Sequence, residues 1–193
     1  MPGPVILAVE GGSFSKAIGG RALMALLLTE GIEPRNLSFT TIDVDGLDAT
    51  EKVVRTLGFG GASVDLVLSD SMPIAGFNMI DPRAVLEGTG TPTAFVLPRK
   101  PDAEGVENAL RKHFLDWRKR LEILTAAGPL IAHKLGDGEV FIECLGIKVS
   151  TAAGLLGRVT IFGKVPEPIR LARMMAREAT HLVGATGTLE LRS

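Results

Sequence analysis

The sequence predicts a single α/β domain over residues 1–193, in which helices flank a mixed β-sheet. Three observations predict it. Short connections join the first three apolar runs, which favours antiparallel pairing because a parallel crossover needs about a dozen residues or more. Beyond these runs, helical and strand-like segments alternate, as in parallel β-α-β units. The chain is 46% hydrophobic, so it can bury a substantial core.

The N-terminal part is expected to form an antiparallel meander. Apolar runs bounded by turn residues are typical of strands, and they occur at Val5–Val9, Ala22–Thr29 and Leu37–Val44. A glycine-flanked turn between residues 11 and 20 separates the first two strands. The connector 30–36 joins the second strand to the third.

A helix and a buried strand follow the meander. Asp48 is suited to the N-cap of this helix, and Glu51, three residues later, would complete a capping box. The helix is expected to end near Gly58, and the apolar run Val64–Ser69 predicts the next strand.

The second half continues the alternation with one long helix. Ala103–Leu124 carries an apolar stripe at intervals of three and four residues, on which Trp117 is expected to be largely buried. The other predicted elements are a short helix from Pro82, strands Thr93–Leu97, Glu139–Leu145 and Thr188–Leu191, and helices Ser150–Val159 and Pro166–Val183. An antiparallel meander followed by parallel strands, flanked by helices, is typical of the ribonuclease-H-like fold.

The composition limits the function classes and the compartment. A net charge of −1 gives no whole-surface field that would attract nucleic acid, although a local basic patch remains compatible with it. The single cysteine, Cys144, excludes an internal disulfide and fits a reducing compartment. The sequence shows neither a signal peptide nor an apolar run long enough for a membrane span, so we expect a cytoplasmic protein with no membrane partner. The oligomeric state stays open, a homo-oligomer included.

Carboxylates follow three of the predicted strands. Glu10 ends the first strand, Asp70 ends the fourth, and Asp48 or Asp45 lies in the turn after the third. Converging carboxylates suit a hard cation such as Mg²⁺ or Mn²⁺. The structural alternatives are that Asp48 caps its helix, Asp70 caps the following turn and Asp45 forms an ordinary Asp-Gly turn.

Several motifs resemble one known family. They are residues 43–50 (DVDGLDAT), 75–81 (AGFNMID), 98–102 (PRKPD) and 166–172 (PEPIRLA). Together they are similar to the largely archaeal endonuclease dU family, which is related to endonuclease V. The resemblance implies a ribonuclease-H-like fold and a metal-dependent endonuclease that acts on nucleic acid, DNA being favoured, at deaminated bases. It also implies Glu10, Asp48 and Asp70 as catalytic metal ligands, with Asp45 as a further candidate ligand.

The chain departs from this family pattern at three positions. Gly11 stands where a second acid is usual, Ser71 stands where glycine is usual, and Arg173 stands where histidine is usual. The first departure removes a possible metal ligand, and the third removes a possible proton donor. They favour an alternative function, a catalytically impaired module that binds nucleic acid or another ligand on the same fold.

Four further residues are candidates for substrate contacts. Lys16 lies in the glycine-flanked loop and could meet a phosphate, although a plain turn is the alternative reading of that loop. Phe77 could stack on a base or pack under its loop, and Asn78 could read a base edge or bond to its own backbone. Arg170 could lie near the site or pair with Glu167.

The long helix also carries basic side chains away from its apolar stripe. They could follow a phosphate backbone, but a solvated helix face is the favoured interpretation. These residues are Arg111, Lys112, Arg118, Lys119 and Arg120.

Overall fold

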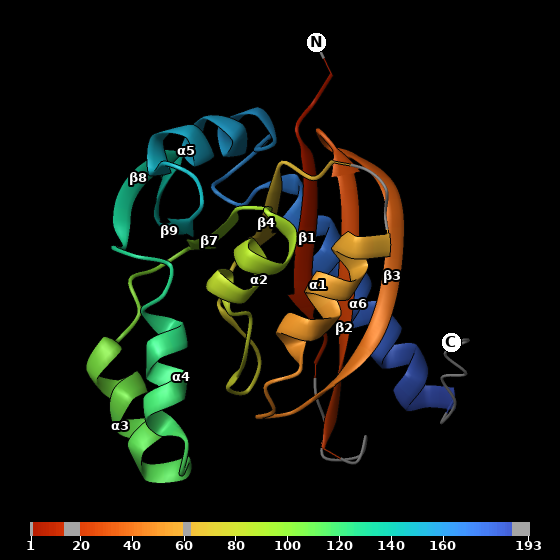
Figure 1. Cartoon of the computed structure of the whole chain (residues 1–193). Helices are drawn as coiled ribbons and strands as arrows, with labels where there is room; N and C mark the ends of the chain where they lie inside the picture. The colour runs from red at the N-terminus through yellow and green to blue at the C-terminus, as the bar shows by residue number, and fades with distance from the viewer. Residues whose placement is uncertain (1, 14–19, 60–62, 187–193) are drawn as a thin grey trace.

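A seven-stranded mixed sheet forms the centre of the protein in its computed structural model, which describes residues 2–13, 20–59 and 63–186 (Figure 1). The strand order is β3-β2-β1-β4-β7-β9-β8, and β5 and β6 form a separate two-stranded sheet. The strands are β1 Val5–Gly11, β2 Arg21–Glu30, β3 Glu33–Asp43, β4 Leu66–Ser69, β5 Pro73–Ala75, β6 Asn78–Met79, β7 Thr93–Leu97, β8 Ile131–Leu135 and β9 Gly138–Leu145. The helices are α1 Ala49–Phe59, α2 Pro82–Thr89, α3 Ala103–His113, α4 Trp117–Leu124, α5 Val149–Arg158 and α6 Glu167–Thr186.

The predicted meander and the predicted parallel pairing of the first and fourth strands are confirmed. β1 pairs antiparallel with β2, and β2 pairs antiparallel with β3, which is the predicted meander. β4 then pairs parallel with β1, and β7 pairs parallel with β4. The sheet closes with the antiparallel β8–β9 hairpin, of which only β9 was predicted. The predicted strand Thr188–Leu191 lies outside the described residues.

Helices cover both faces of the sheet (Figure 1). Along β1, Leu7 and Val9 pack with α1, α2 and α4, whereas Ile6 and Ala8 pack with α5 and α6. This alternation follows from the two-residue side-chain period of a strand. It also places the next even-numbered side chain, Glu10, on the α6 face.

The prediction of one continuous helix over 103–124 is wrong. α3 ends at His113, Phe114 is extended with φ −129° and ψ 127°, and α4 begins at Trp117. The break lets Phe114 form an edge-to-face contact with Phe77, with ring centroids 5.3 Å apart. An apolar stripe cannot reveal such a break, because the three-to-four spacing continues through it.

Trp117 is half-buried, not largely buried as predicted. The guanidinium carbons of Arg111 and Arg118 lie 3.9 and 4.6 Å from its ring centroid. The two arginines therefore cover the indole where we expected core side chains.

No helix in the described part of the chain is long and apolar enough to cross a membrane.

Candidate active site

Glu10 and Asp70 lie side by side at the ends of two adjacent parallel strands. The register pairs Ile6 with Leu66 and Ala8 with Leu68, so the two acids end equivalent rows of side chains. The backbone N–H of Asp70 donates to Oε1 of Glu10 at 3.1 Å. The predicted adjacency of these two carboxylates is therefore confirmed.

Both acids line a cleft of about 230 Å³, which we call the carboxylate cleft. The other described residues that line it are Gly11, Gly12, Ser13, Pro73, Ile74, Arg173 and Arg177. A Cβ atom on Gly11 would overlap the carbonyl oxygen of Ile74. The loop after β4 can therefore approach β1 closely only because position 11 has no side chain.

The guanidinium of Arg173 bridges the two carboxylates. Its Nε lies 3.4 Å from Oε2 of Glu10, and its Nη2 donates to Oδ2 of Asp70. Arg173 comes from α6, the helix that covers this face of the sheet. A cationic side chain of the protein thus neutralises the pair of acids.

The acidity of Glu10 is strongly perturbed. Only 4% of Glu10 is exposed to solvent. Burial and the nearby charge of Asp70 raise the pKa of Glu10 to about 8, although Arg173 and the hydrogen bond from the Asp70 amide both act in the opposite direction. At neutral pH, Glu10 can therefore hold a proton inside the cleft.

Asp48 belongs to a different network from Glu10 and Asp70. Its Oδ1 accepts hydrogen bonds from the side-chain amide of Asn78 at 2.6 Å and from the backbone N–H of Asp43 at 3.1 Å. Ala49, the first residue of α1, donates its N–H to Oδ1 of Asn78. Asp48 does precede the helix as expected, since its carbonyl accepts from the N–H of Lys52 at 3.3 Å. Its side chain bonds to Asp43 and Asn78, however, and makes no capping bond with the first turn among the described residues.

Asp45 and Asn78 hold two loops together. Asp45 adopts a left-handed φ of 62°, and its Oδ1 accepts from the backbone N–H of Phe77 at 2.7 Å. Asn78 is fully buried and also donates to the carbonyl of Asp43 at 2.7 Å.

Within the described ranges, no group of three or more His, Cys, Asp or Glu residues could hold a metal ion.

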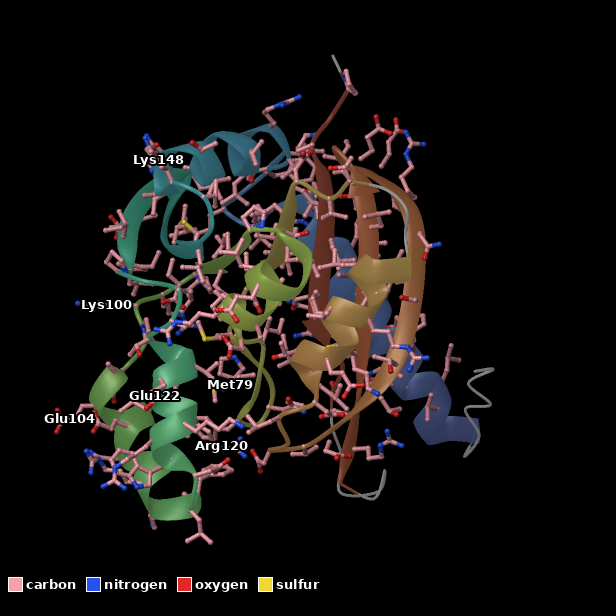
Figure 2. All side chains as sticks on the ribbon, viewed as in Figure 1. Met79, Lys100, Glu104, Arg120, Glu122 and Lys148 are labelled. Carbon is pink, nitrogen blue, oxygen red and sulfur yellow. The ribbon has the colours of Figure 1, made fainter. Side chains whose placement is uncertain are left out.

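Arg120 on α4 bonds to the same two loops. The sequence predicted it on a solvated helix face. Figure 2 shows it extending from α4 toward the core of the molecule. It is buried, and its Nη1 donates to the carbonyls of Gly46 at 3.2 Å and Phe77 at 2.7 Å. The expectation of a solvated face is therefore wrong for Arg120, because a basic residue beside a predicted apolar stripe gives no sign of a buried carbonyl partner.

The remaining candidate contacts have separate positions. Arg170 pairs with Glu167 at 3.2 Å, which is the structural alternative given in the sequence analysis, and it donates to the carbonyl of Phe162 at 2.9 Å. Lys16 lies outside the described residues. Arg177 was not predicted, although positions 173 and 177 lie on one face of a helix, and it lines the carboxylate cleft beside Arg173.

Phe77 lines a second cavity of about 460 Å³, which we call the apolar cavity. It lies between the loop after β4, the end of β7 and the helices α3 and α4. Its wall includes Met72, Pro73, Leu97, Val106, Leu121, Leu124 and Glu143. Pro73 also lines the carboxylate cleft, so the two hollows share a wall.

The fold is shared with a class of nucleases. Endonuclease V from Ciona intestinalis, in complex with a 24mer DNA containing an inosine followed by a ribo-adenosine, superimposes with a TM-score of 0.64 at 12% identity, over 93% of this chain and 87% of that one. Human ENDOV gives a TM-score of 0.60 at 14% identity, over 94% and 86% of the two chains. These similarities show an endonuclease V-like fold.

The chain belongs to the endonuclease dU family, whose pattern matches residues 4–180. A UPF0215 protein from Thermococcus gammatolerans is 34% identical over 176 residues, and one from Pyrococcus furiosus is 32% identical over 175; each match covers 89% of both chains. A protein of unknown function from Archaeoglobus fulgidus has a TM-score of 0.78 at 28% identity, over 90% of this chain and 96% of that one.

Proposed function

We propose that this protein is a divalent-metal-dependent endonuclease that cleaves a nucleic acid strand in the carboxylate cleft. The observation that carries the proposal is the placement of Glu10 and Asp70 at the ends of adjacent parallel strands, in one cleft. In open α/β sheets, ligands bind at the carboxyl ends of the strands.

The two carboxylates fit Mg²⁺ or Mn²⁺ as part of a shared site. Mg²⁺ is usually bound by one or two carboxylates together with substrate phosphates and waters. Such an ion would lower the pKa of a bound water and stabilise negative charge on the phosphate. In this proposal, Glu10 and Asp70 are the ligands, whereas Asp48 and Asp45 keep the loop contacts described above.

Arg173 has to leave the carboxylates when the cleft takes up a metal. Its guanidinium also lines a neighbouring hollow of about 330 Å³, together with Arg170 and Arg177. From there it can pair with a phosphate oxygen of the strand, which is a good match for a planar guanidinium. The same cation then neutralises the acids in the free protein and the phosphate in the complex.

The substrate we propose is DNA that carries a deaminated base. The apolar cavity shares Pro73 with the carboxylate cleft, so a base turned out of the duplex would lie close to its own phosphate. The inosine in the DNA bound to the Ciona endonuclease V supports the same substrate class for this chain.

The test is nicking of duplex DNA that contains one deoxyuridine or one deoxyinosine, with and without Mn²⁺. We expect wild type to nick it only with Mn²⁺, and Asp70→Asn to be inactive while remaining folded. Glu122→Gln is the matched control, because Glu122 is an exposed carboxylate on α4 (Figure 2), and it should nick like wild type. Equal nicking by Asp70→Asn and wild type would refute the proposal.

A second candidate function is a binding module without cleavage chemistry. The observation that favours it is the bridge from Arg173 to both acids, which already supplies the cation that the site needs. Calorimetry distinguishes the two functions: the module would bind DNA without taking up Mn²⁺ at any point of the titration.

A further inference from the structure

Glu143 places a carboxyl group in the wall of the apolar cavity. It lies on β9 opposite Phe95 of β7 and is half-buried. Its carboxyl group makes no hydrogen bond or ion pair with any residue that the structure describes. The cavity is mostly apolar, although Ser71, Lys100 and Thr125 also line it. A polar group in a mostly apolar pocket is the feature that orients a bound ligand.

The surroundings of Glu143 are mostly apolar, and none of the described lining residues forms an ion pair with it. The walls contributed by α3 and α4 present Val106, Leu121 and Leu124, and the loop after β4 presents Met72 and Pro73. The one cationic side chain among the described lining residues is Lys100. It forms no ion pair with Glu143, and Figure 2 shows it extending away from the fold. Cys144 is the next residue on β9. Burial and the charge of Glu143 raise the pKa of its thiol, and a thiol supplies no positive charge.

We propose that Glu143 is a specificity-determining residue that pairs with the edge of a nucleobase held in the apolar cavity. One carboxyl oxygen accepts a hydrogen bond from a ring N–H, and the carboxyl O–H donates to the neighbouring carbonyl of the base. The inference rests on the proposed function, since it takes the ligand to be a nucleobase. It adds a base-reading group that the two acids of the carboxylate cleft do not provide.

The acidity of Glu143 supports this pairing. Burial raises its pKa to about 7, so near neutral pH a large share of the side chain is an uncharged carboxylic acid. An uncharged acid both donates and accepts, whereas a carboxylate only accepts. Glutamine offers the same donor and acceptor pair at every pH, which makes Glu143→Gln the conservative variant.

The test uses 2′-deoxyuridine binding to the metal-free full chain, measured by calorimetry at pH 6 and pH 8. Wild type should bind up to about tenfold more weakly at pH 8, because the uncharged fraction of Glu143 falls as pH rises through its pKa of about 7. Glu143→Gln should bind equally at both pH values, and Glu143→Leu should bind weakly at both. N3-methylated deoxyuridine lacks the ring N–H and should lose affinity for wild type.

The outcomes separate this inference from the nuclease proposal, because no cleavage is measured. The predicted pattern in a protein that fails to nick DNA would support the role of Glu143 and refute the endonuclease. Nucleoside affinity that is undetectable at millimolar concentration, or that is the same for wild type and Glu143→Leu, would overturn the role of Glu143 even if the DNA is nicked.

Discussion

The Nε atom of Arg173 lies 3.4 Å from Oε2 of Glu10, a residue 163 positions earlier in the chain. Because the same guanidinium also contacts Asp70, the two acids share one internal counter-ion. Cation uptake by the cleft therefore competes with an ion pair that the protein already makes.

Removing this counter-ion should strengthen metal binding. We expect Arg173→Ala to bind Mn²⁺ more tightly than wild type, on the order of tenfold or about 1.4 kcal/mol, because the acids no longer have to give up a partner. The metal-free variant should also melt at a lower temperature, since two neighbouring carboxylates lose their cation. Calorimetry and thermal melting with and without Mn²⁺ measure both effects.

Arg177→Ala is the control for this substitution. Arg177 lines the same cleft but makes no ion pair with either acid among the described residues. Its loss should leave Mn²⁺ affinity close to wild type. Unchanged affinity in Arg173→Ala would mean that the guanidinium and the metal do not compete.

Truncating Asn78 should destabilise the protein strongly. Asn78 is fully buried, and Asn78→Ala removes the partner of the Asp43 carbonyl and of the Ala49 N–H, together with one of the two hydrogen bonds to Asp48. Unpaired buried polar groups cost about 1–3 kcal/mol each, so we expect a loss of about 2–4 kcal/mol in urea denaturation. Asn36→Ala, at an exposed position on β3, should change stability by less than about 0.5 kcal/mol. A similar small change in Asn78→Ala would show that the loop network contributes little.

Arg120→Met tests the contact between α4 and the two loops. The variant keeps the apolar stem but loses the bonds to Gly46, Phe77 and Asp116, and we expect a loss of about 2–4 kcal/mol. Arg118→Met is the matched control on the same helix, because Arg118 is exposed and stacks on Trp117 without a hydrogen bond or ion pair to any described residue. It should cost at most about 1 kcal/mol. Urea denaturation measures the free energy of unfolding of both variants. Equal losses would show that the bonds from Arg120 to the two loops contribute no more than an exposed arginine does.

Glu143 should make stability depend on pH. Its pKa is raised to about 7 in the folded protein from a usual value of 4.5, so the folded state binds more protons between these values. Its contribution to stability is therefore fully present below about pH 4.5 and is lost as pH rises through about 7. Melting temperatures from pH 5 to pH 8 should fall less in Glu143→Gln than in wild type.

Glu139→Gln provides the reference for this pH series, because Glu139 is an exposed carboxylate on the same strand. It should retain the slope of wild type. Parallel slopes in all three proteins would contradict the raised pKa of Glu143.

Local patterns predicted the sheet well where strands are apolar and buried. β1, β2, β4 and β7 are short hydrophobic runs that end at turn residues, and their order follows from the lengths of the connections. β8 has no such pattern, because an edge strand with mostly exposed side chains needs little apolar sequence. The break between α3 and α4 depends on Phe77, which lies far away in sequence.

The candidate site was predictable only in part, because some of its contacts join residues that are far apart in the sequence. The period of two along β1 and β4 explains why Glu10 and Asp70 meet on the α6 face. The position of Asp48 depends instead on Asn78, thirty residues away. Arg173 was identified only as a departure from the family pattern, and nothing local indicated that its side chain reaches both acids.

The ion pair between Arg173 and Glu10 also has a consequence for the order in which the protein is made. Glu10 leaves the ribosome early, whereas its counter-ion is part of α6 and is synthesised after all seven strands of the main sheet. A nascent chain can therefore pair β1 with β2 and β4 while both acids still lack their cation. Docking of α6 is then the step that completes the cleft. The bridge between Arg173 and the two acids can therefore form only after α6 has been synthesised.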